Sequence, residues 1–501
     1  MNSSTLLLRN ARKYPKTEAI ISPQGNYTYT ELDEKVNQLA NALREEGIGQ
    51  GDRVCLYMPN TPEFVISYFA VQRIGAIVVP VNAKFTLEEV QFVVSHSGAK
   101  SLIAHAMIFP VIESIAQIDV KIKTGEPAGE WRSMEALMEN APRAEIKCTL
   151  KEDDLSTILY TSGTTGDPKG VLFSYRNILT VAQMIAVELE VKPESRLLIM
   201  MPLTHSAPLH LFLMAGMVVG STHVLTPTFT PELLLKTVSK TNPTHFFGAP
   251  VAYLLTAGYP DIGKYDLSSM KWWVYGGAPL SAEQVDLVSK AFQTDRLTSV
   301  YGLTEAGPSG SILHPEEHGE KTGSIGKRAP LHTELRIVDE NGNDVAVGEV
   351  GEIVLSGEGN MVGYYKNDEL TKATFFGEWL RTGDLARRDE DGYLWIVDRK
   401  KDVIISGGVN IYPKEIEDAI VKFSGIREVA VIGVPHPEWG ETVTAFFAAA
   451  DPIHAEELKL FLSKYLAKFK IPREFEQVEM LPRNASGKIL KTALKNKVVQ
   501  Q

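Results

Sequence analysis

The stretch TSGTTGDPKG, residues 161–170, directly follows the apolar run LSTILY of residues 155–160. Its three glycines allow the backbone to approach a ligand closely, its four hydroxyl side chains can form hydrogen bonds, and Lys169 adds a positive charge. The stretch therefore predicts a phosphate-holding loop at the end of a buried strand. A solvated turn of small residues is the alternative, because loops often have such a composition.

This loop differs from the Walker A loop of nucleotide-binding proteins. That motif requires Gly-Lys followed by Ser or Thr at the start of a helix, with the hydroxyl on magnesium. Here Pro168 precedes Lys169, and Gly170 follows it. The sequence thus predicts a phosphate site of another class.

Length and composition place the chain among ordinary globular proteins of several domains. With 501 residues it exceeds the size of one hydrophobic core, so roughly two to four cooperative units are expected. Its net charge of −11 argues against a broad nucleic-acid-binding surface. Only Cys55 and Cys148 are present, which supports neither a disulfide framework nor a cysteine metal site and fits a reducing cytoplasm.

No segment of the chain has the features of a membrane span or an export signal. The first residues carry charges directly after a short apolar run. The most apolar stretch, residues 209–220, is shorter than the roughly 20 residues that cross a bilayer. We therefore expect no transmembrane segment, and peripheral membrane contact stays open.

The first part of the chain alternates between helix and strand patterns. Residues 30–47 have the apolar spacing of a helix, with Thr30 and Asp33 as its expected capping box. Residues 53–58 and 76–81 read as buried strands on either side of a helical segment. This alternation predicts an α/β fold with parallel sheets covered by helices.

The sequence pattern changes at two points further along the chain. After about residue 323, short strand patterns joined by polar turns predict a smaller β-rich subdomain. The charged run DRKKD, residues 398–402, then precedes about a hundred residues with the content of an independent α+β domain. The charged run is a candidate hinge, with a solvated turn between strands as the alternative.

Three further segments carry functional residue types. Residues 201–213, MPLTHSAPLHLFL, are expected to form a proline-bracketed loop that contains His205 and His210, and a structural role for a lone histidine is the alternative. Residues 275–279, YGGAP, end a strand in two glycines, as a ligand at the carboxyl edge of a sheet requires. Residues 301–305, YGLTE, combine a stacking ring, a hydroxyl and a carboxylate that suit a base, a phosphate and a metal.

Two more segments complete the series. Residues 381–384, RTGD, offer a carboxylate that could accept hydrogen bonds from both ribose hydroxyls. Residues 482–488, PRNASGK, present Lys488 after a Ser-Gly turn close to the C-terminus. A lysine in such a turn is also compatible with simple solvent exposure.

Together and in this order, these segments resemble the acyl- and aryl-CoA synthetases of the adenylate-forming superfamily, which also includes luciferases and nonribosomal peptide adenylation domains. The motifs YTSGTTGDPKG, YGLTE, RTGDL and PRNASGK carry the resemblance across nearly the whole chain. It implies a large N-terminal domain, residues 1–400, of two α/β sheet subdomains and the β-rich subdomain at about 323–398. A small mobile α+β domain, residues 401–501, would follow, with its hinge at Lys401.

The resemblance implies an ATP-dependent acyl-CoA ligase. A carboxylate would attack the α-phosphate of ATP to give an acyl-adenylate and pyrophosphate, and the thiol of coenzyme A would then displace AMP. The implied cofactors are ATP and Mg²⁺, with coenzyme A as co-substrate, in a cytoplasmic enzyme. No nucleic-acid partner is expected, and the sequence leaves monomer and homodimer both open.

The resemblance also assigns roles to individual residues. The phosphates would contact Thr161, Ser162, Gly163, Thr164, Thr165, Gly166 and Lys169. The adenosine and α-phosphate would contact Gly276, Gly277, Ala278, Tyr301, Gly302, Thr304, Asp384 and Arg399. Glu305 with Thr161 would place magnesium, and Lys488 would catalyse adenylation. The acyl pocket would lie at His205, Gly276 and Gly302, and the path of coenzyme A at Gly407 and Gly408.

The substrate is inferred from the segment around His205. Residues 201–213 contain no acid that could pair with a substrate amine, and an ammonium group left unpaired there would cost roughly 2 to 5 kcal/mol. They also contain no arginine that could pair with a second carboxylate of the substrate. An apolar monocarboxylate is expected, with a medium- or long-chain fatty acid favoured over an aryl or cinnamate-type acid. Transfer of the acyl group to a carrier protein and a luciferase-like monooxygenase reaction remain open.

Overall fold

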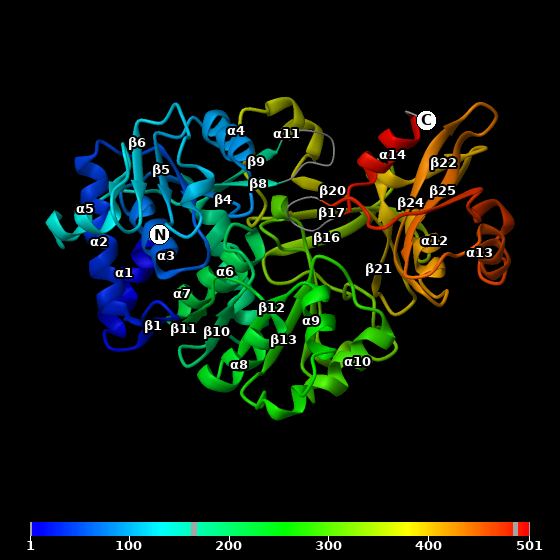
Figure 1. The fold of residues 1–501 in the computed structure, drawn as a ribbon, viewed down its shortest axis with the longest axis horizontal. Helices are drawn as coiled ribbons and strands as arrows, with labels where there is room; N and C mark the ends of the chain where they lie inside the picture. The colour runs from blue at the N-terminus through cyan, green and yellow to red at the C-terminus, as the bar shows by residue number, and fades with distance from the viewer. Residues whose placement is uncertain (1–2, 162–167, 484–488, 500–501) are drawn as a thin grey trace. The chain divides into compact units, whose positions relative to one another are not determined.

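The computed structural model describes residues 3–161, 168–483 and 489–499 (Figure 1). These residues form two compact units. One contains residues 3–161, 168–335 and 355–380, and the other contains residues 336–354, 381–483 and 489–499.

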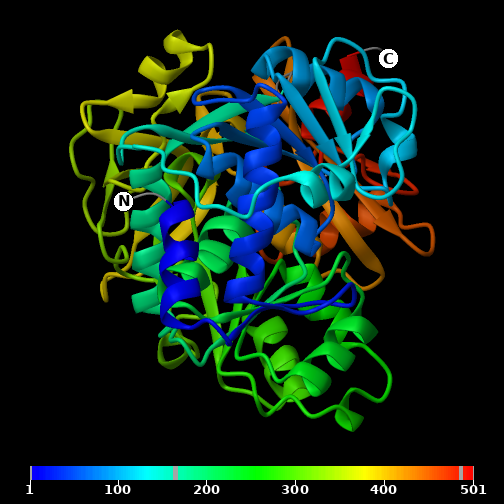
Figure 2. The same ribbon diagram turned by 90° about the vertical axis from the view of Figure 1, so that its left-hand side faces the viewer.

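The first unit contains two mixed sheets, each of eight strands. One has, in spatial order, the strands β18 (Gly363–Tyr364), β9 (Lys169–Ser174), β8 (Leu155–Thr161), β4 (Ile77–Val81), β3 (Arg53–Tyr57), β5 (Ser101–Ala104), β6 (Val120–Lys123) and β7 (Arg132–Ser133). Its helices include α1 (Ser3–Lys13), α2 (Tyr29–Glu45), α3 (Pro62–Arg73), α4 (Leu87–Ser97) and α5 (Met134–Asn140). Helices α1 and α2 lie side by side in the blue part of Figure 2.

The second sheet of this unit is mostly parallel. Its strands, in spatial order, are β15 (Ser311–Leu313), β14 (Leu297–Tyr301), β13 (Trp272–Gly276), β12 (His245–Gly248), β10 (Arg196–Ile199), β11 (Thr222–Leu225), β1 (Glu18–Ile21) and β2 (Tyr27–Thr28). The helices between and after these strands are α6 (Tyr175–Glu188), α7 (Ala215–Val219), α8 (Pro231–Thr241), α9 (Pro250–Ala257), α10 (Ala282–Phe292) and α11 (Asp368–Thr374).

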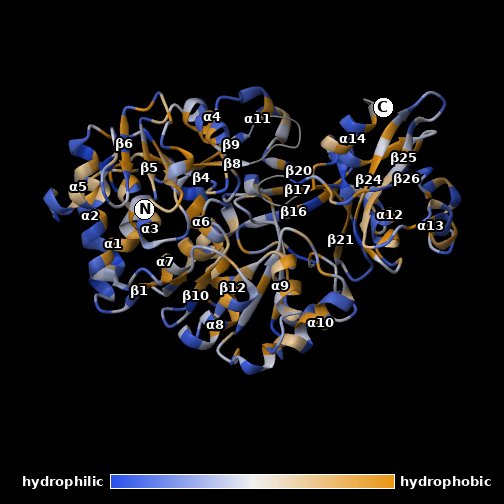
Figure 3. Ribbon diagram, viewed as in Figure 1, coloured by the Kyte–Doolittle hydropathy of each residue, from blue (hydrophilic) through white to orange (hydrophobic). Residues whose placement is uncertain are grey.

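A hydrophobic core fixes the position of this second sheet. Phe246, Tyr253 and Trp273 are buried and pack against α8 and α10 through Val238 and Val288. Figure 3 shows the hydrophobic residues, in orange, along β12 and β13. Because strands β10, β12, β13 and β14 are mutually parallel, their carboxyl ends lie at one edge of the sheet.

The β-rich sheet contains β16 (Thr333–Val338), β17 (Val350–Gly357), β20 (Trp379–Arg388), β19 (Phe375–Phe376) and β21 (Leu394–Arg399). The division between the two units falls within its strands. The fourth sheet belongs to the second unit and contains β23 (Val409–Ile411), β22 (Ile404–Ser406), β25 (Gly440–Ala449), β24 (Ile426–His436) and β26 (Glu474–Gln477). Helices α12 (Pro413–Ile420), α13 (Ala455–Leu462) and α14 (Lys491–Val499) accompany it.

The start of α2 corrects one prediction. The capping box uses Thr28 and Glu31, not Thr30 and Asp33. Thr28 Oγ1 accepts from the Glu31 amide at 3.3 Å, and the Glu31 carboxylate accepts from the Thr28 amide at 2.8 Å. Asp33 instead forms a buried ion pair with Arg73 at 2.7 Å. A buried guanidinium requires a charged partner, which explains the acid at this position.

The predicted fold class is confirmed: the chain has two α/β sheet subdomains, a β-rich subdomain and a small α+β region toward the C-terminus. The domain boundary at residues 400/401 stays a prediction. Among the described residues, no helix combines the length and the hydropathy that crossing a bilayer requires.

Candidate functional site

The parallel sheet brings several predicted site residues to its carboxyl edge. Strand β13 ends at Gly276 and β14 ends at Tyr301, and Gly276 pairs with Val300 in the register. Gly277 and Ala278 follow β13, while Gly302, Thr304 and Glu305 follow β14. In open α/β sheets, ligands bind at this edge because the loops after the strands leave a crevice there.

Two glycines of this edge lie against backbone. A Cβ at Gly276 would lie 2.7 Å from the Val300 carbonyl oxygen, and one at Gly302 would lie 2.6 Å from the Pro308 carbonyl oxygen. Such distances exclude any side chain. The predicted acyl and adenine contacts at these glycines therefore coincide with a packing requirement of the fold.

We expect Gly302→Ala to lower the free energy of unfolding by about 1–3 kcal/mol, because its methyl group would press on the Pro308 backbone, which cannot rotate away. Urea unfolding measures this loss. Gly263→Ala is the matched control, since a Cβ there meets nothing within 4 Å. Equal stability of the two variants would contradict the close packing at Gly302.

The segment around His205 differs from its prediction. The expected loop is helical from residue 207, where Ala207–Met214 forms a π-helix that continues into α7. His205 and Ser206 stand just before it, and the Ser206 hydroxyl lies 3.2 Å from the Thr304 hydroxyl. A π-helix has hydrogen bonds from residue i to residue i+5, and a sequence pattern of period 3.6 does not reveal it.

The two histidines of this segment have different surroundings. Burial, and to a lesser extent the charge of Lys84, lowers the pKa of the half-buried His205, so its ring is neutral at pH 7. His210 is fully buried, burial lowers its pKa to about 4, and its Nδ1 lies 2.6 Å from the Gly307 carbonyl. His210 is thus a structural histidine, which leaves His205 as the candidate for substrate contact.

The phosphate-loop segment begins and ends in paired strands. Thr161 at the end of β8 pairs with Lys169 at the start of β9, so the loop's two ends are neighbours. The predicted contacts at Ser162, Gly163, Thr164, Thr165 and Gly166 lie outside the described residues.

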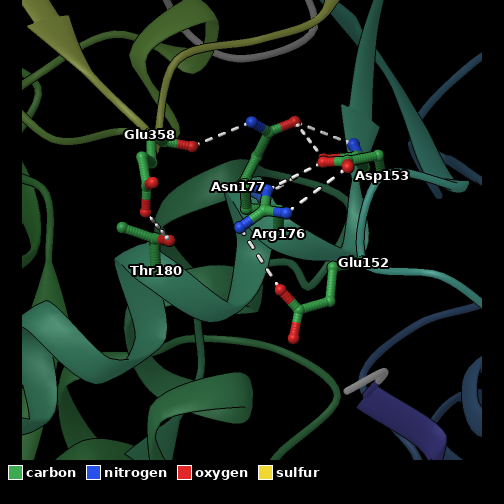
Figure 4. Close-up of polar contacts among 7 residues, drawn as sticks. Glu152, Asp153, Arg176, Asn177, Thr180 and Glu358 are labelled. Carbon is green, nitrogen blue, oxygen red and sulfur yellow. Dashed lines mark hydrogen bonds and ion pairs between the residues drawn. The ribbon is translucent and has the colours of Figure 1, made fainter.

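The first turn of α6 contacts two separate segments of the chain (Figure 4). The Arg176 guanidinium donates to Asp153 at 2.7 Å, just before β8, and pairs with Glu152 at 3.2 Å. The Asn177 amide donates to the Glu358 carbonyl at 2.8 Å. Helix α6 therefore holds both the approach to the phosphate loop and the segment that leads into β18.

Glu305 contacts a residue that the sequence analysis did not single out. The Tyr364 hydroxyl donates to Glu305 Oε1 at 2.8 Å, and Lys169 Nζ lies 5.7 Å from the centroid of the Tyr364 ring. Among the described residues, no hydrogen bond to the other carboxylate oxygen is found. A carboxylate oxygen is a ligand that Mg²⁺ prefers, so Glu305 fits the metal role that the resemblance implies.

The second unit places the predicted ribose residues together. Asp384 on β20 pairs in register with Arg399 on β21, and Arg399 Nε donates to Asp384 Oδ1 at 2.8 Å. Arg399 also donates to the Thr382 carbonyl at 3.2 Å. These contacts fix both side chains on adjacent strands, where they form one polar cluster.

The residues predicted for the coenzyme A path and for the hinge also belong to this unit. Gly407 and Gly408 form the two-residue turn between β22 and β23, with φ of +57° and +79°. Both values favour glycine, as in the type I′ turn of a hairpin, independently of any coenzyme A path. Lys401 lies in a short 3₁₀ turn, Lys400–Asp402, and Lys488 lies outside the described residues.

Comparison with protein families covers most of the chain. Residues 7–365 match the family described as AMP-binding enzyme. Residues 415–488 match the family described as AMP-binding enzyme C-terminal domain.

Known relatives are similar over nearly their full lengths. A feruloyl-CoA synthase of an Amycolatopsis species is 36% identical over 97% of this chain and 96% of its own. The long-chain-fatty-acid–CoA ligase FadD13 of Mycobacterium tuberculosis is 33% identical over 99% of this chain and 98% of its own.

Solved structures agree with these matches. The anthranilate CoA ligase AuaEII in complex with anthranoyl-AMP has a TM-score of 0.90 at 28% identity, covering 99% of this chain and 97% of that one. ATP-bound MatB from Rhodopseudomonas palustris has a TM-score of 0.89 at 29% identity, covering 99% of both chains. The resemblance inferred from the motifs is thereby confirmed: the chain is an AMP-binding enzyme and belongs to the acyl-CoA synthetases of the adenylate-forming superfamily.

Proposed function

We propose that this protein activates an apolar carboxylic acid with ATP and transfers the acyl group to coenzyme A. One observation carries the proposal. Gly276 and Tyr301 end neighbouring strands at one sheet edge, and Thr304, which follows Tyr301, contacts the segment that holds His205. A nucleotide site and an acyl site would therefore adjoin.

The proposed reaction has two steps. An acyl carboxylate oxygen attacks the α-phosphorus of ATP, the bond to the β-phosphate breaks, and pyrophosphate leaves. The sulfur of coenzyme A then attacks the acyl carbon, loses its proton, and AMP leaves. Both steps depend on positioning and charge neutralisation, so no protein nucleophile is needed.

The proposed roles follow from the chemistry of the side chains. Lys169 would neutralise the β- and γ-phosphates, Thr304 would donate to the α-phosphate, and Tyr301 would stack on adenine. Asp384 and Arg399 would hold the ribose. When bound at Glu305, magnesium would reduce the negative charge that the carboxylate meets.

The acyl group would be apolar, with a medium- or long-chain fatty acid favoured. The π-helix Ala207–Met214 after His205 is built almost entirely of apolar residues and has no acid or arginine. A relative that acts as a feruloyl-CoA synthase and another that is a long-chain-fatty-acid–CoA ligase support the two alternatives, aliphatic and aryl acids. We place the reaction in the cytoplasm, where both ATP and coenzyme A are supplied.

A pyrophosphate-release screen tests the proposal. Acids of graded chain length and aromaticity are offered with ATP and Mg²⁺, with and without coenzyme A. We expect release with fatty acids of medium or long chain, about 10-fold or more above short or charged acids, because each buried CH₂ contributes about 0.8 kcal/mol. A preference for cinnamate-type acids would select the aryl alternative, and no release with any acid would refute the proposal.

The acceptor needs a separate experiment. With the preferred acid, coenzyme A is compared with a phosphopantetheinylated carrier protein. We expect thioester formation with coenzyme A. Thioester formation on the carrier alone would instead assign the chain to the ligases that load carrier proteins.

A further inference from the structure

Tyr364 contacts two oppositely charged residues of the candidate nucleotide site. Its hydroxyl donates to Glu305 at 2.8 Å, and the Lys169 ammonium lies 5.7 Å from its ring centroid. The tyrosine is 8% exposed. A buried phenol in contact with both groups can influence each of them.

The backbone fixes Tyr364 independently of the Glu305 side chain. In β18 it pairs with Val171 of β9, and its amide donates to the Thr371 hydroxyl at 2.8 Å. Nearby, the Met361 amide donates to the Glu305 carbonyl at 2.8 Å. The same short segment thus holds both the main chain and the carboxylate of Glu305, which keeps the carboxylate in one orientation.

Lys169 and Glu305 each contact Tyr364. Within the part of the chain that the structure describes, no ion pair joins Lys169 to Glu305. Tyr364 offers a hydroxyl hydrogen to the carboxylate and its ring face to the ammonium, so each charge has a favourable contact of its own.

We propose that Tyr364 is a positioning residue that orients Glu305 toward a magnesium-bound nucleotide and holds Lys169 apart from that carboxylate. The proposal deepens the function proposed above and rests on it. A carboxylate that is free to turn could form an ion pair with Lys169, and both groups would then be withdrawn from the metal and the phosphates.

The test is Tyr364→Phe, which keeps the ring and removes the donor. The probe is Mn²⁺ together with α,β-methylene-ATP, and bound Mn²⁺ is measured by electron paramagnetic resonance. We expect Mn²⁺ binding to weaken about 10-fold, the low end of the effect that loss of a hydrogen bond to a metal ligand has on metal affinity. Tyr364→Ala, which also removes the ring between the charges, is expected to bind more weakly still.

Tyr365→Phe is the matched control. Tyr365 directly follows β18, and its hydroxyl donates to the Ser97 carbonyl at 3.1 Å rather than to Glu305. We expect unchanged Mn²⁺ binding in this variant. Unchanged binding in Tyr364→Phe, or an equal loss in Tyr365→Phe, would overturn the proposal.

A kinetic readout separates positioning from general damage. Pyrophosphate release by Tyr364→Phe should need about 10-fold more Mg²⁺ for half its maximal rate, with the rate at saturating Mg²⁺ largely kept. A lower maximal rate with an unchanged Mg²⁺ requirement would overturn the positioning role. If the wild-type protein releases no pyrophosphate with any acid and the Mn²⁺ difference is still found, the positioning role stands and the proposed function fails.

Discussion

Lys488→Ala is expected to lower the rate of acyl-adenylate formation by roughly 100- to 1,000-fold and to leave thioester formation from a supplied acyl-adenylate largely intact. The physical reason is charge. During adenylation an anionic carboxylate approaches a polyphosphate, and negative charge develops at the α-phosphate. A lysine that contacts both groups stabilises this transition state more than the separate substrates.

The two half-reactions are measured separately. Pyrophosphate release reports the first, and AMP release from synthetic acyl-adenylate with coenzyme A reports the second. Only the first has an attacking anion at phosphorus, so only the first should need the lysine. Equal loss of both would contradict the assigned role.

Lys491→Ala is the matched control for this variant. Lys491 lies three positions further along the chain and forms an ion pair with Glu417 at 2.7 Å. Its loss removes one nearby positive charge and one contact of the second unit, yet it should leave adenylation within a few-fold. If both lysine variants lose adenylation alike, a damaged C-terminal region explains the effect better than catalysis by Lys488.

The carboxyl edge of the parallel sheet could be predicted from the sequence because its signal is local. Strand β13 is an apolar run that ends in a glycine, and the motif YGLTE marks the end of β14. Parallel pairing then brings separate segments to one edge without any knowledge of their contacts. The strand before the phosphate-loop segment could be predicted for the same reason, since residues 155–160 are an apolar run, whereas the phosphate contacts stay a prediction.

The contacts between distant segments could not be predicted in this way. Tyr364 and Glu305 are 59 positions apart, and the short strand with Tyr364 has no charged residue that marks a site. The π-helix after His205 depends on hydrogen bonds that reach one residue further than in an α-helix, which hydrophobic spacing does not specify. The sequence offers two candidate capping boxes, Thr28 with Glu31 and Thr30 with Asp33. The structure uses the first, because Asp33 is buried in an ion pair with Arg73.

Lys401→Pro is expected to keep adenylation within a few-fold and to lower thioester formation by roughly 100-fold, the effect that misplacement of a reacting group can have. The resemblance implies that the C-terminal domain rotates about this residue between the two steps. Proline fixes φ near −65° and restricts the residue before it, so a rotation that needs a change of these angles is blocked.

The contacts around Lys401 show why a backbone change there should act selectively. Before it, Lys400 pairs with Glu352 at 3.1 Å, and the Asp398 carboxylate accepts from the Lys414 amide of α12 at 2.7 Å. Neither contact is made by Lys401 itself, so we expect the fold that supports adenylation to persist in Lys401→Pro.

Lys401→Ala distinguishes a backbone effect from a charge effect, because it removes the ammonium group and keeps the backbone free. Its thioester formation should fall much less than that of Lys401→Pro. Thioesterification is followed as AMP release from acyl-adenylate with coenzyme A, and the melting temperature of both variants shows whether the fold is kept. A proline variant with a normal overall rate would place the hinge elsewhere, whereas equal losses in both variants would mean that the lysine charge, and not rotation of the backbone, supports the second step.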